Sequence, residues 1–386
     1  MRFIHTADWH LGRLFHSLHL TDDQRFTLDG LFKLAQSSQA DAVVIAGDVF
    51  DRAVPPPDAV GLLDSIVARL ALDAGVAVVM IAGNHDSAAR LEYFSELARR
   101  SGVHVVGRVG PEVRPAELRG ADGTEVSFWP IAYTDPESAR GEMGRDDIHT
   151  HQEAIAAQLE TIARAADGST RNVVVGHAFV SGCRQSESER ELTVGGSAAV
   201  SAALFNDFDY VALGHLHERQ TAGSDRIRYS GSLLKYSFSE TDQQKSVSIV
   251  DLGPQGQLSV REAHLPIRRD VRRVRGAFEE LLSRDVGEGL AEAYVEVILT
   301  DSDPILNPVD KLRKQFPFLL SLRREGSDRA VLGPAAGTSD IKTRSTAELF
   351  EDFFADVSGH PVSEAQAGEL ASALNDLQRA AREATA

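Results

Sequence analysis

The chain has 386 residues, of which 42% are hydrophobic and 25% charged, and its formal net charge is −17. This length predicts two or three domains, and the lack of any apolar run near the ~18–20 residues that span a bilayer excludes a membrane-spanning protein. A single cysteine, Cys183, excludes an internal disulfide framework, and we expect a cytoplasmic protein. The acidic balance is unusual for a protein that binds nucleic acid unaided. It is consistent with bound divalent cations, with a partner that supplies the DNA contacts, or with an ordinary acidic enzyme.

The first two-thirds of the chain alternate apolar runs with helical patterns. Strands are expected at residues 2–6, 41–46, 76–82 and 103–106, and helices at 22–36, 58–72 and 87–100. Further strands are expected at 126–131, 172–175, 209–213, 227–230, 246–251 and 258–263, with a helix at 149–164. Short Val/Ile runs separated by helices indicate an α/β sheet covered on both faces. The surplus of strands over helices predicts a second sheet packed on the first.

The pattern changes near Pro266. The most basic stretch, Arg268–Arg275, is followed by alternating helices and strands at 277–284, 293–299, 309–315 and 318–323, which predicts a small α/β unit. We therefore divide the chain into domains at 1–267 and 268–328, a linker at 329–344 and a helical tail at 345–386. Ser345 with Glu348, and Ser363 with Gln366, predict capping boxes for the two tail helices.

Five short polar motifs each follow an apolar strand-like run. They are Asp8-Trp9-His10, Gly47-Asp48-Val49-Phe50-Asp51-Arg52, Gly83-Asn84-His85-Asp86, Gly176-His177 and Gly214-His215-Leu216-His217. Because the carboxyl ends of strands in an open α/β sheet meet at one rim, we expect these motifs to converge there. The glycines let the backbone turn and approach a ligand closely. Singly, several of these motifs are unremarkable, and His177 alone would be read as a hydrogen-bonded core histidine.

The collected side chains are carboxylates, imidazoles and one amide, which suit Mn²⁺, Fe²⁺ or Zn²⁺. In Asp-x-His and His-x-His, an extended backbone would project both side chains from the same side, so that each pair can clamp one ion. Two ions ~3.5–4 Å apart can clamp a phosphate and activate water for in-line attack. Among the histidines that match none of these motifs, five are interpreted as structural or surface residues: His5, His16, His19, His104 and His151.

In this order, the motifs resemble the calcineurin-like metallophosphoesterase superfamily. Residues 6–12, 47–52, 186–190 with 194–196, and 229–240 resemble the bacterial SbcD nucleases in particular, over residues 1 to about 265. The resemblance implies a four-layer α/β/β/α sandwich with a small α/β cap domain and a C-terminal helical tail. It also implies a Mn-dependent DNA nuclease with 3′–5′ double-strand exonuclease and single-strand or hairpin endonuclease activity. Such a nuclease acts in DNA repair, and its partner is SbcC, a coiled-coil ATPase.

Carried over by motif, the resemblance implies a role for each site residue. The first metal ion would be held by Asp8, His10, Asp48 and His217, and the second by Asp48, Asn84, His177 and His215, with Asp48 bridging. His85 would protonate the leaving 3′-oxygen or stabilise the charged transition state, and Asp51 would orient it through a carboxylate–imidazole pair. Asp86 would support the ligands without binding metal.

The expected contacts with substrate leave alternatives open. Arg52 either contacts the phosphate or forms a surface salt bridge. Lys235 and Tyr236 either touch DNA or pack beneath the ligand loops. The Ser186–Arg190 stretch is a polar loop or plain exposed chain. The Arg268–Arg275 run either positions DNA or is a solvated strand face, and its imperfect alternation excludes one shared arginine face.

The partners are predicted chiefly from the resemblance. The tail, with Phe350, Phe353 and Phe354, would grip the coiled-coil base of SbcC, unless it packs on the protein's own body. A homodimer within a heterotetramer is also implied. Two other functions compete with the nuclease: a phosphoesterase acting on nucleotides or phosphoproteins, which the acidic charge favours, and a non-catalytic DNA-end scaffold, which the intact ligand set disfavours.

Overall fold

The protein divides into two compact units, Met1–Arg268 and Arg269–Ala386, in a computed structural model. The structure describes residues 1–166, 168–189, 192, 198–283, 287–303, 305–326, 330–332, 354, 362–363 and 366–370. Among these described residues, no helix is long and apolar enough to cross a membrane.

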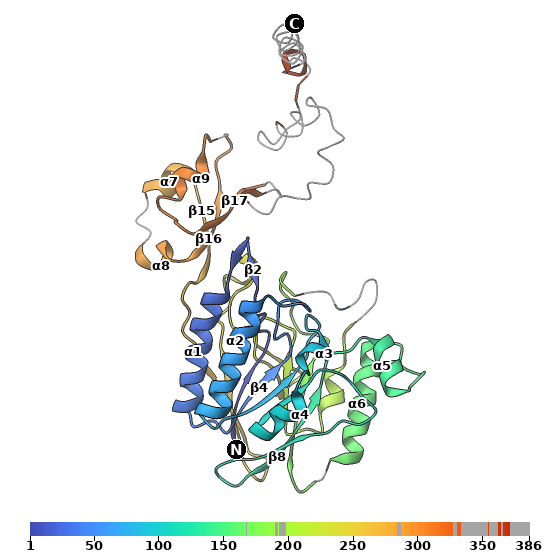
Figure 1. Cartoon of the computed structure of the whole chain (residues 1–386). Helices are drawn as coiled ribbons and strands as arrows, with labels where there is room; N and C mark the ends of the chain where they lie inside the picture. The colour runs from blue at the N-terminus through green and yellow to red at the C-terminus, as the bar shows by residue number, and fades with distance from the viewer. Residues whose placement is uncertain are drawn as a thin grey trace, which may run out of the picture. The chain divides into compact units, whose positions relative to one another are not determined.

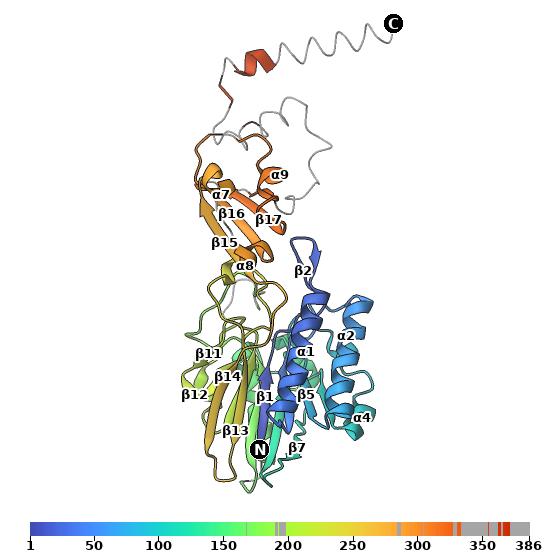
Figure 2. The same ribbon diagram turned by 90° about the vertical axis from the view of Figure 1, so that its left-hand side faces the viewer.

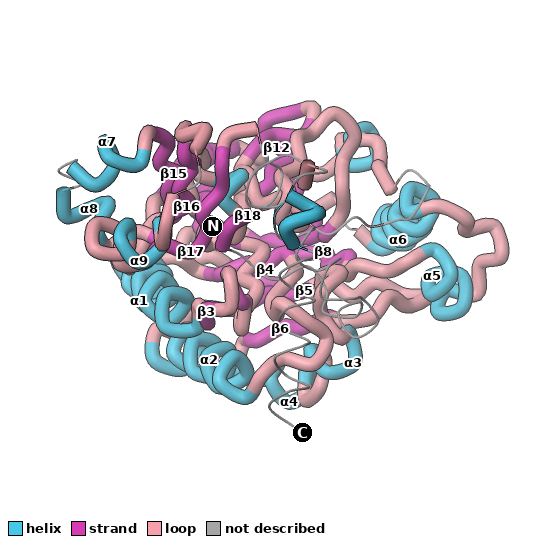
Figure 3. Tube along the Cα trace, turned by 90° about the horizontal axis from the view of Figure 1, so that it is seen from above, coloured by secondary structure: helices cyan, strands magenta, loops and turns pink. Residues whose placement is uncertain are grey.

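The first unit contains a six-stranded sheet in the order β14-β13-β1-β4-β5-β6. Four strands run parallel: β1 (Arg2–Thr6), β4 (Ala42–Ala46), β5 (Ala77–Ile81) and β6 (Val103–Val106). The hairpin of β13 (Val247–Leu252) and β14 (Leu258–Ala263) joins β1 antiparallel, as Figure 2 shows. The long helices α1 (Thr21–Ser37) and α2 (Pro57–Ala68) lie side by side along the outer flank of this sheet (Figures 1 and 3).

A second six-stranded sheet has the order β11-β12-β10-β9-β8-β7. Its central strands β8 (Glu125–Ile131), β9 (Arg171–His177), β10 (Tyr210–Gly214) and β12 (Ser224–Tyr229) run parallel. The edge strands β7 (Ala116–Arg119) and β11 (Gln220–Ala222) are antiparallel to their neighbours. The helices α5 (Pro136–Met143) and α6 (His151–Ala165) lie on the opposite flank from α1 and α2 (Figure 3).

The main core lies between the two sheets. Alternate residues from both sheets pack there, including Phe3 and Val44 from the first and Phe128, Val173 and Tyr210 from the second, each with no exposed surface. Burial on both faces explains why these strands read as continuous apolar runs. The predicted second sheet and the four-layer α/β/β/α class are therefore confirmed.

One expected helix is broken. The helical pattern over residues 87–100 forms only α3 (Ala88–Leu91), α4 (Ser95–Ala98) and a 3-10 turn at Arg99–Ser101. Phe94, between the two short helices, has φ +61°, which an α-helix cannot accommodate. Elsewhere, α2 continues into a π-helical turn at Arg69–Asp73, and the short hairpin of β2 (Leu14–Phe15) and β3 (Leu18–His19) was not predicted.

The second unit is the expected small α/β structure. Its sheet has the order β15-β16-β17-β18, with bounds Val271–Gly276, Tyr294–Leu299, Leu319–Arg324 and Ala330–Leu332. Its helices are α7 (Phe278–Ser283), α8 (Gly287–Ala291) and α9 (Pro308–Leu312). Val295, Val297 and Phe316 form the centre of its core. In β15, Val271 and Val274 are buried while Arg272, Arg273 and Arg275 are exposed, and the arginines do not share one face.

The linker and most of the tail lie outside the described residues, as does the predicted capping box of Ser345 with Glu348. The second predicted capping box is present. The Ser363 amide donates to Gln366 Oε1 over 2.9 Å, and the Gln366 amide donates to Ser363 Oγ over 3.4 Å.

Candidate metal centre

The ends of five strands gather the predicted ligand residues in the first unit. Asp8 and His10 follow β1, Asp48 follows β4, Asn84 follows β5, His177 ends β9, and His215 and His217 follow β10. Six of the seven side chains are buried, and Asn84 is partly exposed. The sequence motifs therefore converge at one rim, as expected from strand topology.

Asp48 lies between two groups of donors. Its Oδ2 is 3.7 Å from His10 Nε2, and its Oδ1 is 3.6 Å from His177 Nε2. Asn84 Oδ1 lies 3.0 Å from His177 Nε2 and 3.3 Å from His215 Nδ1. One carboxylate thus reaches both groups, which is the geometry that a ligand shared between two ions requires.

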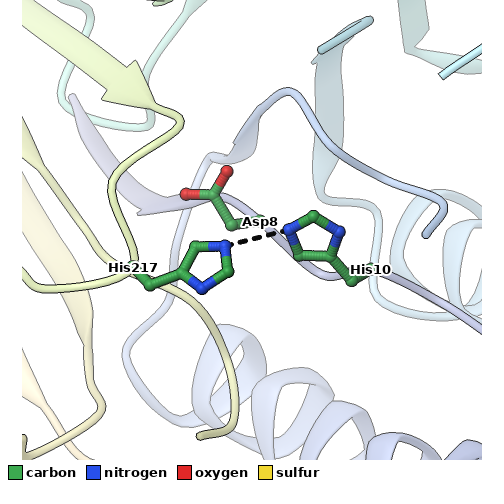
Figure 4. A group of neighbouring side chains, drawn as sticks. All are labelled: Asp8, His10 and His217. Carbon is green, nitrogen blue, oxygen red and sulfur yellow. Dashed lines mark hydrogen bonds between the residues drawn. The ribbon is translucent and has the colours of Figure 1, made fainter. Parts of the chain in front are cut away.

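The donors on the His10 side are drawn in Figure 4. The Nε2 atoms of His10 and His217 face each other at 3.0 Å, with the Asp8 carboxylate beside them. Ligand atoms of these three residues lie within 4.8 Å of one another, as do those of Asp8, Asp48 and His177. Two imidazole nitrogens that face each other need either one proton or one cation between them.

The backbone at the ligands is strained. Asp8, His10, Asp48 and His215 have φ values of +52°, +44°, +48° and +105°. The expectation of an extended backbone at Asp-x-His and His-x-His is therefore wrong, because left-handed turns, not strand pleating, direct these side chains inward. Such conformations cost ~1–3 kcal/mol each and persist where function requires them.

Two glycines permit the close approach of the strand ends. A Cβ at Gly83 would lie 2.2 Å from Asp48 Oδ1. A Cβ at Gly214 would lie 1.9 Å from the Ala46 carbonyl oxygen and 2.9 Å from His177 Nδ1. No larger residue fits at either position without separating the ligands.

The electrostatics of the cluster fit bound cations. Burial and the nearby Asp48 carboxylate raise the pKa of Asp8 well above its ordinary value. Burial and neighbouring imidazoles lower the pKa of His10 and His215. Asp8 Oδ2 and His215 Nε2 are buried without a hydrogen-bond partner among the described residues. Neutral imidazoles and crowded carboxylates with unused lone pairs suit divalent ions such as Mn²⁺, Fe²⁺ or Zn²⁺.

His85 is oriented differently from the expectation. Its Nδ1 donates to the backbone carbonyl of Asp51 over 2.8 Å, and its Nε2 lies 3.9 Å from Asp48 Oδ2. The Asp51 carboxylate instead pairs with Arg13 at 2.7 Å. Asp51 therefore orients His85 through its backbone carbonyl and not through its carboxylate, because the carboxylate points toward the Arg13 guanidinium.

Asp86 ties two ligand loops together. Its carboxylate accepts hydrogen bonds from the amides of Val49, Phe50 and Gly83 over 2.8–3.0 Å. Burial and the nearby Asp48 carboxylate raise the pKa of Asp86 to about 7. These contacts give Asp86 the supporting place expected for it, outside the ligand set.

The three residues expected to contact substrate differ in exposure and in their hydrogen-bond partners. Arg52 is exposed, and no partner is found for it among the described residues. The Lys235 ammonium donates to the Thr241 carbonyl over 2.8 Å. Tyr236 is 3% exposed, and its hydroxyl donates to the Trp9 carbonyl over 2.5 Å. Tyr236 packs edge-on against His10, so that its expected contact with DNA is wrong and the packing alternative holds.

Sequence reasoning missed the residues that hold His217. Its Nδ1 lies 2.7 Å from Ser188 Oγ and 3.3 Å from Glu240 Oε1, and its amide donates to Glu189 Oε1 over 2.7 Å. Lys245 Nζ lies 2.6 Å from Glu240 Oε2. Although burial opposes its ionisation, Glu240 keeps a pKa below its ordinary range because of the Lys245 charge. Ser188 and Glu189 lie in the 186–190 stretch and Glu240 in the 229–240 stretch, but no local sequence pattern predicts their contacts with His217.

Comparison with known proteins agrees with this geometry. The calcineurin-like phosphoesterase family model matches residues 1–219. The chain therefore belongs to the calcineurin-like phosphoesterase family and is a metal-dependent phosphoesterase. A second family model, described as the type 5 capsule protein repressor C-terminal domain, matches residues 267–358.

A curated relative extends the similarity along nearly the whole chain. It is the SbcD component of the nuclease SbcCD from Staphylococcus epidermidis, 29% identical over 377 residues that cover 97% of this chain and 98% of the relative. The resemblance to the SbcD nucleases is thus confirmed.

Solved structures are more distant. A dimetal phosphatase from Danio rerio has a TM-score of 0.42 and 12% identity, over 68% of this chain and 95% of its own. A Thermus thermophilus protein has a TM-score of 0.39 and 14% identity, over 68% and 98%. These likenesses add nothing to the assignment.

Proposed function

We propose that this chain is a DNA nuclease that hydrolyses phosphodiesters with two divalent ions, of which Mn²⁺ is the physiological choice. The observation that carries the proposal is the convergence of six other donor residues around Asp48 in a chain similar along 97% of its length to a nuclease component. Asp8, His10, Asp48 and His217 would hold one ion, and Asp48, Asn84, His177 and His215 the other. When bound, the ions would polarise the phosphate and activate the attacking water.

His85 is the proposed proton donor. Its Nδ1–H is committed to the Asp51 carbonyl, which leaves Nε2, on the Asp48 side of the ring, to exchange a proton. His85 is partly exposed, so that a substrate can reach it. Arg52 follows the buried Phe50 by two residues and has no partner among the described residues. Its guanidinium is therefore available to contact a phosphate near His85.

The test is Mn²⁺-dependent degradation of linear DNA by the wild type and His85→Ala. We expect His85→Ala to lower the rate by about 10²–10⁴-fold while two ions remain bound, because general acid catalysis contributes that much. His104→Ala, which replaces a partly exposed histidine outside the cluster, is the matched control. Equal rates for wild type and His85→Ala would remove His85 from the mechanism.

The finer activities rest on the same similarity. We propose 3′–5′ exonuclease action on duplex ends and endonuclease action on single strands and hairpins, regulated by ATP in an SbcC-type ATPase. End-labelled duplex and hairpin DNA, with and without partner and ATP, separates these activities. Strong turnover of a nucleotide or phosphoprotein with none on DNA would instead favour the alternative phosphoesterase. The net charge of −17 is the observation that supports this alternative.

A homodimer is proposed through the outer edge of the first unit. Between α2 and the α3–α4 segment lies an apolar groove of about 760 Å³, lined by Val60, Leu72 and Tyr93. These side chains are 46%, 70% and 73% exposed, and the neighbouring Phe94 and Leu97 are 61% and 62% exposed. Contiguous apolar exposure of this kind marks an association surface, and a second copy could bury the same residues in an isologous contact.

Light scattering tests this surface. We expect Leu72→Glu together with Tyr93→Glu to convert a dimer to a monomer, whereas Leu306→Glu, at a leucine of the second unit that is 81% exposed, should not. A monomeric wild type at micromolar concentration would contradict the proposal.

A further inference from the structure

The cluster of side chains behind His217 forms a chain of hydrogen bonds that ends in an ion pair. The Ser188 hydroxyl donates to Glu240 Oε1, and the same Ser188 oxygen lies 2.7 Å from His217 Nδ1. The other Glu240 oxygen is paired with the Lys245 ammonium at 2.6 Å. Glu240 has no exposed surface, and the side chain of Lys245 is 7% exposed. Burying an ion pair carries a desolvation penalty, so its presence at the end of this chain suggests that it has a role there.

Counting donors fixes the state of His217. A carboxylate paired with an ammonium only accepts hydrogen bonds, so Ser188 uses its single proton toward Glu240. Ser188 must then accept from His217, which places the imidazole proton on Nδ1. Nε2 is left with its lone pair and points toward His10 and Asp8 (Figure 4).

The main chain of His217 is held by the same groups. The Lys245 ammonium also donates to the His217 carbonyl over 2.8 Å and to Gln243 Oε1 over 2.6 Å. Lys245 therefore combines two hydrogen bonds with its ion pair to Glu240. On the other side, the His217 amide donates to Glu189 Oε1 over 2.7 Å. Ring, carbonyl and amide are thus all fixed.

Among the described residues, no other histidine ligand candidate is hydrogen-bonded to a chain that ends in a buried ion pair, although His10 Nδ1 lies 3.7 Å from Asp51 Oδ1, which pairs with Arg13. His177 Nδ1 donates to the Ala46 carbonyl over 2.9 Å. His10 Nδ1 has no hydrogen bond among the described residues. A hydrogen-bond acceptor behind a ligating imidazole raises its basicity and fixes its tautomer, and here the Ser188 acceptor is itself backed by the Glu240 carboxylate.

We infer that Ser188, Glu240 and Lys245 are positioning residues for metal binding, which hold His217 as the Nδ1–H tautomer and present Nε2 to the ion. The inference rests on the proposed two-ion site and adds to it residues that touch neither ion nor substrate.

Ser188→Ala is the decisive variant because it removes the 2.7 Å contact with His217 Nδ1, leaves only the longer 3.3 Å approach of Glu240 Oε1, and keeps the buried Glu240–Lys245 pair intact. Calorimetric titration of the metal-free full-length protein with Mn²⁺ should show two ions bound by the wild type. In Ser188→Ala we expect one of the two binding steps to weaken by about 10–100-fold. Ser188→Thr restores a hydroxyl and should restore the affinity. Ser181→Ala, at an exposed serine on the same segment, should leave both steps unchanged.

Nitrogen NMR of the metal-free protein gives a second readout. The wild type should show His217, assigned by its disappearance in His217→Gln, as the Nδ1–H tautomer, and Ser188→Ala should lose that preference. The Nε2–H tautomer in the wild type would overturn the inference, even if Ser188→Ala failed to fold. Equal Mn²⁺ affinities for wild type and Ser188→Ala would also overturn it. A wild type that binds no divalent ion would instead defeat the proposed function.

Discussion

The two units of the molecule treat buried and half-buried charge in opposite ways. In the ligand cluster, carboxylates and imidazoles are crowded together, and Asp8 Oδ2 and His215 Nε2 have no hydrogen-bond partner among the described residues. In the second unit, the exposed arginines of β15 are matched. The pairs are Arg272 with Asp270 at 2.7 Å, Arg273 with Glu296 at 2.6 Å and Arg275 with Glu325 at 2.5 Å. The ligand cluster therefore holds carboxylate and imidazole atoms that have no hydrogen-bond partner among the described residues, whereas these arginines of β15 are already paired with carboxylates.

The paired arginines of β15 limit the role expected for the second unit. Arginines that already pair with carboxylates must exchange partners before they contact DNA phosphates. A role for Arg268–Arg275 in positioning DNA stays a prediction. Among the described residues, the ion pairs of these arginines favour the alternative interpretation, a solvated strand face.

The largest effect is expected at the unmatched site. Asp48→Asn removes the charge shared by both groups of donors, and DNA hydrolysis should fall by about 10³-fold or more. Without metal, the same change should leave the melting temperature equal or higher, because Asp48 contributes to the raised pKa of Asp8 and of Asp86. Melting curves in EDTA and in Mn²⁺ measure both effects. A clear fall in metal-free stability would break the comparison.

In the second unit, the opposite response is expected from Glu296→Gln. Glu296 is 2% exposed and lies 2.6 Å from Arg273 and 3.4 Å from Arg323. Its removal should cost about 2 kcal/mol, less than the ~3–5 kcal/mol of a fully buried pair because both arginines are half exposed. Urea unfolding of the full chain provides the measurement, and an unchanged midpoint would show that this pairing is not needed for stability.

Outside the ligand cluster, the buried His5 has a hydrogen-bond partner at each ring nitrogen. His5 Nδ1 contacts Tyr210 Oη at 3.0 Å and Nε2 contacts the Leu213 carbonyl at 3.1 Å, and burial lowers the pKa of His5 to about 3. The unfolded chain binds a proton at this histidine near pH 6.5, well before the folded chain does. The stability due to neutral His5 is therefore complete above pH 6.5 and is lost as pH falls toward 3.

At pH 5 this loss amounts to about 2 kcal/mol. His5→Gln should flatten the dependence of unfolding free energy on pH between 6.5 and 4, relative to the wild type. Parallel curves for the two proteins would show that His5 already titrates normally in the folded state.

The smallest effect is expected at the surface. Arg275 and Glu325 are 59% and 50% exposed, so Arg275→Ala should change the unfolding free energy by only about 0.5 kcal/mol. The same denaturant curves test it beside Glu296→Gln. A loss comparable to that of Glu296→Gln would mean that exposure does not separate the two pairs.

The sequence was informative where one physical signal dominates. Val/Ile runs such as 42–46 and 77–81 predicted buried strands, and the motif after each strand predicted convergence at one rim. It failed where the outcome depends on single backbone torsions. Phe94 at φ +61° breaks the expected helix, and the left-handed Asp8 and His10 replace the expected extended pairs. Residue preferences do not predict these left-handed conformations, because tertiary contacts stabilise them.

Side-chain partners were the other gap. Tyr236 carries a hydroxyl and an aromatic ring, which suit DNA binding equally well as packing, and only its burial decides between them. Ser188 and His217 are 29 positions apart, and Glu240 and His217 are 23 apart, so their contact depends on how distant loops meet.

The hydrogen bond from His85 to the Asp51 carbonyl has a consequence for variation at position 51. The acceptor belongs to the peptide group, so replacing the side chain leaves the orienting contact chemically intact. A substitution at position 51 can therefore change the charge at this point of the rim without removing the hydrogen bond that orients His85, the proposed proton donor.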